Sequence, residues 1–268
     1  MPFASGGEGK NRENNIRVAR ATAICQTGGM KKSVAFDRKI SELDWPRIGA
    51  DLDTAGVANA GPVLDVAECV ALAALYADES CFRSRVVMAR HGFGSGEYKY
   101  LSYPLPATIA ALRAAFYPPL AAIANRWAGA LGATDAFPPS LDAMLARCHA
   151  DGQTKPTPLM LSYREGDYNC LHQDIYGAHV FPLQVVILLS DPARDFDGGE
   201  FVVVEQRPRM QSKAEVVVLR QGEAAIFATR ERPKQGTKGV YRVQLRHGVS
   251  RIRRGERKTL GLIFHDGA

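Results

Sequence analysis

The chain has 268 residues, of which 46% are hydrophobic and 23% charged, with a formal net charge of +6. This composition is typical of a globular protein with a sizeable core and excludes a chain too polar to fold. Five scattered cysteines without a C-x-x-C pair argue against a disulfide framework or a zinc ribbon and favour a reducing compartment. Without a signal-peptide core or a run of roughly 18 apolar residues, we expect a cytoplasmic protein with no membrane segment. The basic, small-residue-rich segment RVARATAIC leaves an amphipathic targeting peptide as an alternative. No obligate protein partner is expected.

The positive charge is unevenly distributed along the chain. Between Glu205 and Lys258 there are 15 Lys and Arg against 5 Asp and Glu, a surplus of ten positive charges. Such a cluster suits a phosphate backbone or another acidic partner. A solvated basic face explains the composition equally well.

The N-terminal half is predicted to be a polar tail followed by helices. Residues 1–38 are polar and without periodicity, which predicts a disordered tail, and residues 39–268 are predicted to form a single domain. A helix is expected after Asp65, because Asp65 and Glu68 have the spacing of a capping box. We expect residues 39–150 to be a helical buttress, with one strand in the segment RVVMAR before a glycine-rich loop.

Two further features interrupt this helical stretch. Residues 107–132 have helical apolar spacing but contain Pro118-Pro119, which predicts two helices broken at that point. The glycine-rich segment that follows His91 lacks the helix of a dinucleotide-binding loop. It is interpreted as a mobile lid whose Lys99 and Tyr100 contact the substrate, or as an ordinary flexible loop.

After Gly152 the sequence changes to short β-branched runs separated by turn residues. The runs are PLMLSY, LQVVILLS, EFVVVEQ, EVVVLR, AAIFAT, VYRVQL and KTLGLIFH. Many short strands with regular turns indicate a sandwich or barrel. We therefore expect an α+β protein in which a β core, residues 151–268, is supported by the preceding helices.

A candidate metal site lies at the edge of this β core. His172 and Asp174 form an H-x-D pair, and residues i and i+2 of a strand face the same way. His247 follows later, at the end of another predicted strand. Two imidazoles and one carboxylate leave three positions of a ferrous ion open for a cosubstrate and oxygen. An isolated H-x-D pair is common by chance, so neighbouring motifs must support it.

The order of these motifs resembles that of the iron(II)- and 2-oxoglutarate-dependent oxygenases. After the H-x-D pair come Gly198-Gly199-Glu200, then Gly222 with Phe227 five positions later, then His247 with Arg257 ten positions later. The resemblance covers roughly residues 155–266. It implies a double-stranded β-helix, a jelly-roll barrel, with iron(II), 2-oxoglutarate and O2 as cofactors.

The resemblance also implies roles for other residues. Arg257 would bind a carboxylate of 2-oxoglutarate, for which the alternative is a structural salt bridge. Tyr163 would contact the same cosubstrate, as in AlkB-like relatives, or would simply pack in the core. Arg251 is a second candidate, either for the carboxylate or for support of Asp174.

The substrate implied is a methylated or damaged base, in DNA and possibly in RNA. The chain resembles bacterial AlkB-like and TET-like oxygenases, which implies oxidative demethylation or oxidation of 5-methylcytosine. A buried base would have to be flipped out, with Tyr176 or Phe181 as stacking candidates. The basic residues before His247 are candidates for phosphate contacts. These residues are Arg230, Arg232, Lys234 and Lys238.

Two other functions remain open from the sequence. A protein hydroxylase of the prolyl type shares every motif named above. A non-catalytic jelly-roll binding module, with an accidental H-x-D pair, would bind neither iron nor 2-oxoglutarate.

Overall fold

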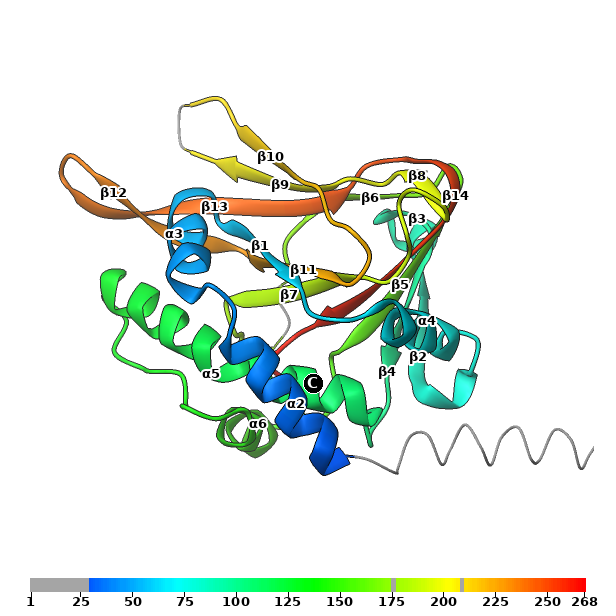
Figure 1. Ribbon diagram of the computed structural model, residues 1–268. Coiled ribbons are helices and arrows are strands. Elements are labelled where there is room, and N and C mark those ends of the chain that lie inside the picture. Colours follow the sequence, from blue (N-terminus) through cyan, green and yellow to red (C-terminus); the bar gives the residue numbers. More distant parts are fainter. Residues whose placement is uncertain (1–28, 175–176, 208–209) are drawn as a thin grey trace, which may run out of the picture.

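Two antiparallel sheets form the centre of the protein, seen in a computed structural model that describes residues 29–174, 177–207 and 210–268 (Figure 1). Within these residues the large sheet has the strand order β1 (Val57–Pro62), β11 (Glu223–Ala228), β7 (Leu183–Leu188), β14 (Ile252–Leu262), β5 (Leu159–Arg164), β4 (Glu97–Leu101) and β2 (Phe82–Val87), with β8 (Phe196–Gly198) beside β14. The small sheet has the order β10 (Lys213–Val217), β9 (Phe201–Gln206), β13 (Gly239–Val249), β6 (Tyr168–His172) and β3 (Gly94–Ser95), with β12 (Glu231–Gly236) beside β13. This arrangement confirms the expected α+β jelly-roll fold.

Helices cover the outer face of the large sheet (Figure 1). The helices are α2 (Gly29–Ser41), α3 (Trp45–Ala55), α4 (Val66–Leu75), α5 (Ala107–Ala130) and α6 (Leu141–Ala150), with short 3-10 turns η1 (Glu79–Cys81) and η2 (Met88–His91). Helix α5 packs against α2 and α6. Helix α4 has the predicted capping box, in which the backbone of Glu68 donates to Asp65 and the backbone of Asp65 donates to Glu68.

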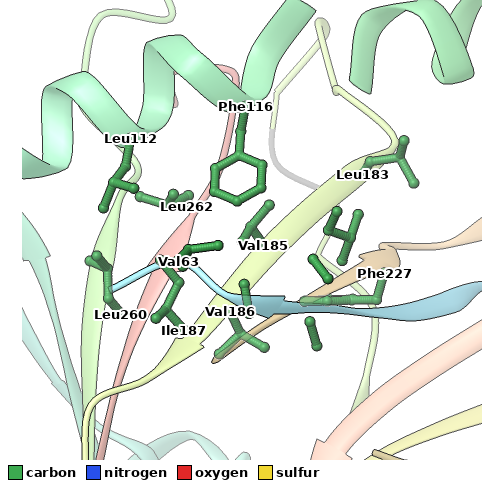
Figure 2. Packing of buried hydrophobic residues seen from close by; sticks show 14 of the residues in the cluster. Val63, Leu112, Phe116, Leu183, Val185, Val186, Ile187, Phe227, Leu260 and Leu262 are labelled. Carbon is green, nitrogen blue, oxygen red and sulfur yellow. The ribbon is translucent and has the colours of Figure 1, made fainter. Parts of the chain in front are cut away.

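The hydrophobic core lies between α5 and the large sheet. Figure 2 shows Leu112 and Phe116 of α5 above Leu260 and Leu262 of β14. Because side chains alternate along a strand, the neighbouring Arg257 and Thr259 face the opposite side, where they line a cavity. The large sheet therefore has one face in the core and one face toward a cavity between the two sheets.

The predicted domain boundaries need two corrections. Helix α2 begins at Gly29, and its Phe36 and Ile40 are buried, so the boundary predicted at residue 38 falls inside a packed helix. The stretch 39–150 is not purely helical, because it also contains β1, β2, β3 and β4. Strands β1 and β4 extend the large sheet on opposite sides, which a helical buttress would not do.

Helix α5 is continuous through Pro118 and Pro119, where the sequence predicts a break. Each proline removes one backbone donor, a cost that usually interrupts a helix. Packing offsets that cost, since Phe116, Tyr117 and Leu120 are fully buried around the two prolines. The helix is long and apolar enough to span a membrane by length and composition, but 61% of that stretch is buried in the protein, as in a core helix.

The glycine-rich segment after His91 is part of both sheets. Strand β3 pairs with β6, and β4 pairs with β2 and β5. The interpretation of this segment as a mobile lid is therefore wrong, because backbone hydrogen bonds join it to its neighbours on both sides of the cavity.

Candidate metal centre

Two histidines and one aspartate converge on the small sheet. His172 is the last residue of β6, and His247 lies directly opposite it on β13. One carboxylate oxygen of Asp174 is 3.6 Å from Nε2 of His172, and the other is 3.4 Å from Nε2 of His247. Ligand atoms of the three residues all lie within 4.8 Å of one another. The structure thus brings together the three side chains that the sequence pattern predicts as metal ligands.

Strand alternation does not explain the position of Asp174, contrary to the prediction. Strand β6 ends at His172, so Asp174 lies in the segment after it. Between them, the side-chain amide of Gln173 donates to the carbonyl oxygen of Leu245, at 2.8 Å, and to Oε1 of Gln244, at 3.1 Å. These bonds fasten the segment to β13 and place Asp174 between the two imidazoles.

The donor set fits a metal ion such as iron(II). Nδ1 of His172 is 2.8 Å from the carbonyl oxygen of Cys170, so Nδ1 carries the hydrogen and Nε2 offers its lone pair toward Asp174. The two Nε2-to-oxygen distances exceed normal hydrogen-bond lengths, as expected for groups that share an ion rather than a proton. Two imidazoles and one carboxylate occupy half of an octahedral sphere, which leaves the other half for further ligands.

The protonation states suit metal binding as well. Burial raises the pKa of Asp174, but His247 and His172 outweigh this effect and hold the pKa at about 2, so the carboxylate is ionised. Burial, and then the neighbouring His247, lower the pKa of His172, which favours the neutral imidazole that a metal requires.

Aromatic rings hold His247 in place. Its ring centroid lies 4.6 Å from that of Phe227 on β11 and 6.1 Å from that of Phe201 on β9. Phe227 follows Gly222 by five residues, and Gly222 has a φ of 82° at a point where a Cβ would overlap the carbonyl oxygen of Leu64. The Gly-x-x-x-x-Phe motif is thus a tight turn followed by a ring that packs on the second histidine.

The triad faces a cavity between the two sheets, with a volume of about 930 Å³ when space open to solvent is counted. Arg257 and Tyr163 line one end, on directly paired positions of β14 and β5. The guanidinium carbon of Arg257 lies 5.9 Å from the Tyr163 ring centroid, and the Tyr163 hydroxyl accepts a hydrogen bond from Asn169 at 3.2 Å.

Arg257 is a buried cation that forms no ion pair with a carboxylate of the described residues. It is 3% exposed, and in the described part of the chain no carboxylate forms an ion pair with it. Burial lowers its pKa to about 10, so the guanidinium stays charged at neutral pH. A buried charge must be paired, and a carboxylate ligand in the cavity would supply the partner. The alternative role as a structural salt bridge is not supported.

The Gly-Gly-Glu motif leaves room for this arginine. Gly199 has a φ of 64°, and a Cβ there would lie 2.8 Å from Cδ of Arg257. The next residue, Glu200, accepts a hydrogen bond from the Ser250 hydroxyl and pairs with Arg253 at 3.1 Å. The motif thus brings β9 and β14 close together beside the buried guanidinium.

Several predicted substrate or cosubstrate residues face away from the cavity. Lys99 is buried, and its Nζ donates to the carbonyl oxygen of Tyr76 at 3.0 Å and to Glu79 at 2.6 Å. Phe181 is fully buried against Tyr117, Phe137 and Phe264 in the core. These two assignments are wrong.

Two arginine assignments are wrong for different reasons. Arg232 is 1% exposed and binds Glu205 and the carbonyl oxygens of Asp53 and Thr54, so it joins β12 to α3. Arg251 is exposed and does not line the cavity, so it neither binds a cosubstrate there nor supports Asp174.

The remaining candidates have mixed outcomes. Tyr100 lines the cavity. Lys234 is bound to Glu205 at 2.8 Å, which occupies its charge. Arg230 and Lys238 are exposed. Tyr176 lies outside the described residues.

Other cavity residues are absent from the sequence-based predictions. Tyr98, Phe93 and Gln184 line the cavity with Tyr100, and a hydrogen bond from the Gln184 side chain helps to hold the pKa of Asp174 low. Burial raises the pKa of Tyr98, and the charge of Asp174 raises it further, which places the phenol near the triad. Strand alternation could have predicted Tyr98 as a cavity residue. Lys99 and Tyr100 must face opposite sides of one strand, and Tyr98 faces the same side as Tyr100.

Comparisons with known proteins agree with this geometry. A family described as an oxygenase catalysing oxidative methylation of damaged DNA matches residues 96–267. An uncharacterized protein of two Mycobacterium tuberculosis strains is 53% identical over 165 residues, which are 62% of this chain and 71% of that protein.

Two solved structures are also similar in shape. A prolyl-4-hydroxylase of Pseudomonas putida has a TM-score of 0.47 and 16% identity, covering 83% of this chain and 100% of that chain. A 2OG-Fe(II) oxygenase family protein of Burkholderia pseudomallei has a TM-score of 0.46 and 18% identity, covering 85% of this chain and 94% of that chain.

Proposed function

We propose that this protein, which belongs to the family of oxygenases catalysing oxidative methylation of damaged DNA, oxidises a methyl group on a nucleic-acid base. The family match and the His-Asp-His triad confirm the expected superfamily, with iron(II), 2-oxoglutarate and O2 as cofactors. The observation that carries the proposal is that one cavity contains both this triad and a buried arginine that pairs with no carboxylate of the described residues.

Each residue of the site has a defined part in this proposal. His172, Asp174 and His247 would hold the iron. Arg257, which lies beside Tyr163, would bind a carboxylate of 2-oxoglutarate. The bound iron supplies the oxidation, in which 2-oxoglutarate becomes succinate and carbon dioxide while the two atoms of O2 enter succinate and a substrate C–H bond.

The product depends on where the methyl group is attached. Hydroxylation of an N-methyl group gives an unstable hemiaminal that releases formaldehyde and leaves the base demethylated. Hydroxylation of a C-methyl group, as in 5-methylcytosine, leaves a stable hydroxymethyl group. Exposed Arg230 supports a nucleic-acid substrate, because its backbone carbonyl oxygen accepts a hydrogen bond from Gln173, the residue between His172 and Asp174.

The test is an assay with methylated oligonucleotides in the presence of iron(II) and 2-oxoglutarate. We expect succinate formation coupled to either formaldehyde release or hydroxymethyl bases, and neither product from the His172→Ala variant. Oxidation of prolyl peptides but of no oligonucleotide would instead support a protein hydroxylase. Absence of 2-oxoglutarate turnover with every substrate would support a non-catalytic binding module.

A further inference from the structure

Arg257 borders a second cavity besides the one that the triad faces. This second cavity has a volume of about 610 Å³ when space open to solvent is counted. It is lined largely by β8, β10 and the segments next to them, and by no residue of the triad. Among the described residues, only Arg257 and Phe201 line both cavities. These two side chains therefore form the partition between the first cavity, which contains the triad, and the second.

The guanidinium of Arg257 lies between one aromatic ring of each cavity. Its carbon is 5.9 Å from the ring centroid of Tyr163, which lines the first cavity, and 6.0 Å from that of Phe196, which lines the second. A guanidinium has five N–H donors, and a carboxylate bound side-on accepts from two of them. A carboxylate can therefore reach this guanidinium from either cavity.

The first cavity opens to solvent near the triad rather than near Arg257. The side chain of His172 is 33% exposed, whereas Arg257 is 3% exposed. A 2-oxoglutarate held between the iron and Arg257 would thus lie deeper than the substrate, which approaches the triad from the open side. Because a bound substrate closes that side, succinate formed behind it cannot leave through the first cavity.

The second cavity suits the passage of a carboxylate better than its storage. Asp197 and Glu200 line it, and both pair with Arg253, at 3.2 Å and 3.1 Å. One arginine offsets the charge of two acids only in part, which disfavours a stable anion site beside them. Arg257 is the single cation that lines this cavity in the described chain. A route must attract a ligand enough to admit it and hold it weakly enough to release it.

We propose that 2-oxoglutarate enters and succinate leaves through the second cavity, past Arg257, while the substrate stays in the first cavity. The inference rests on the proposed function for the role of Arg257, and it assigns separate routes to cosubstrate and substrate. Rotation of the Arg257 and Phe201 side chains opens the partition without movement of the backbone. A substrate that stays bound while succinate is exchanged for 2-oxoglutarate can be oxidised more than once.

The experiment measures how fast 2-oxoglutarate binds to the iron(II)-loaded full chain without O2. The signal is the visible absorption band that appears when a 2-oxo acid chelates iron(II), followed by stopped flow at several 2-oxoglutarate concentrations. The variants Val217→Trp and Val218→Trp place a large ring in the second cavity, and Val218 is 75% exposed, so its replacement does not disturb the core. Val216→Trp is the matched control, because Val216 is 57% exposed on β10 and lines neither cavity.

Both second-cavity variants should slow association and dissociation by the same factor, roughly tenfold, and should leave the Kd unchanged. The reason is that a narrowed route alters both rates but not the bound state. Val216→Trp should behave like the wild type. A saturating methylated oligonucleotide should leave the wild-type rates unchanged, since it occupies the other cavity.

Wild-type rates in both second-cavity variants would overturn the separate route, and so would a weaker affinity without slower association. Slower binding of 2-oxoglutarate in the presence of the oligonucleotide would overturn it as well, because both ligands would then share the first cavity. If no oligonucleotide binds, the proposed nucleic-acid function fails, whereas the tryptophan variants still decide whether the route exists.

Discussion

The positive charge of Arg257 is buried at the cavity wall and is paired with no carboxylate of the described residues. Removing that charge does not expose a buried anion, so the fold does not depend on it as it would on half of a buried ion pair. The cost of its removal should therefore appear in cosubstrate binding.

We predict that Arg257→Ala raises the KM for 2-oxoglutarate about ten- to a hundredfold, since hydrogen bonds to charged groups contribute about 1.5–3 kcal/mol. Iron affinity should stay unchanged, because Arg257 does not belong to the triad. Steady-state kinetics and a metal titration measure the two effects. Arg254→Ala is the control, being an exposed arginine on the same strand. An unchanged KM would remove Arg257 from the cosubstrate site.

His265 determines part of the acid sensitivity of the fold. It is fully buried, and its Nδ1 accepts a hydrogen bond from the backbone of Phe181 at 3.1 Å, which requires a neutral ring. Burial, and then the charge of Arg113, lower the pKa of His265 from 6.5 to about 4. Between these two values the unfolded chain binds a proton that the folded protein does not, so stability falls as the pH falls.

Between pH 6.5 and pH 4 the free energy of unfolding should fall by on the order of 3 kcal/mol at most because of His265. Below pH 4 this residue should cause no further pH dependence of stability. Urea unfolding across this range measures it. The His265→Leu variant should be less stable at neutral pH but should lose less stability on acidification than the wild type. Equal losses of stability on acidification in both proteins would show that His265 does not cause this pH dependence.

At the scale of elements, β14 shows how backbone geometry positions a functional side chain. Gly255 has a φ of 80°, and a Cβ there would overlap the carbonyl oxygen of Asp195. The strand can pass this point only with glycine, two residues before Arg257.

Gly255→Ala should therefore lower the free energy of unfolding by more than about 2 kcal/mol, as strain from the left-handed backbone is added to a steric clash. The control is Gly132→Ala, where φ is 75° but no atom lies within 4 Å of the added Cβ. It should lose only the backbone cost of about 1–2 kcal/mol. Equal losses, measured by denaturant unfolding, would contradict the steric argument.

The predictions of helices and strands are correct where the local sequence pattern agrees with the packing of the folded protein. Each of the seven β-branched runs after Gly152 overlaps a strand, because β-branched runs bounded by turn residues are a local signal. Helix α5 was predicted as broken, since the sequence shows its prolines but not the core that surrounds them. Strands β1 and β4 were missed because their pairing partners, β11 and β5, are distant in sequence.

At the scale of the whole molecule, each of the two sheets contributes different residues to the site. The small sheet contributes the two histidines of the triad, and the large sheet contributes Arg257, Tyr163, Tyr98 and Tyr100. Sequence order predicted the triad, because motifs keep their order along the chain. It could not separate buried from exposed cations, and so Arg232, which binds Glu205, was grouped with the exposed Arg230.

The exposed cations should govern the salt dependence of nucleic-acid binding. Arg230 and Lys238 form no ion pair within the described residues, so both are available to phosphates. The Arg230→Gln/Lys238→Gln double variant should reduce the slope of log affinity against log salt by about 2. Arg253→Gln is the control, as Asp197 and Glu200 already bind that arginine. Fluorescence anisotropy at several salt concentrations measures the slopes, and equal slopes would exclude the two residues from phosphate contact.

The most direct test of the metal centre is a calorimetric titration of iron(II) into the protein without O2. We predict that one ion binds per wild-type chain and that 2-oxoglutarate then binds only to the iron-loaded protein. Replacement of His247 by alanine should abolish tight iron binding, because His247 supplies one of three converging ligand atoms. Iron binding that survives in both the His172→Ala and the His247→Ala variants would contradict the account.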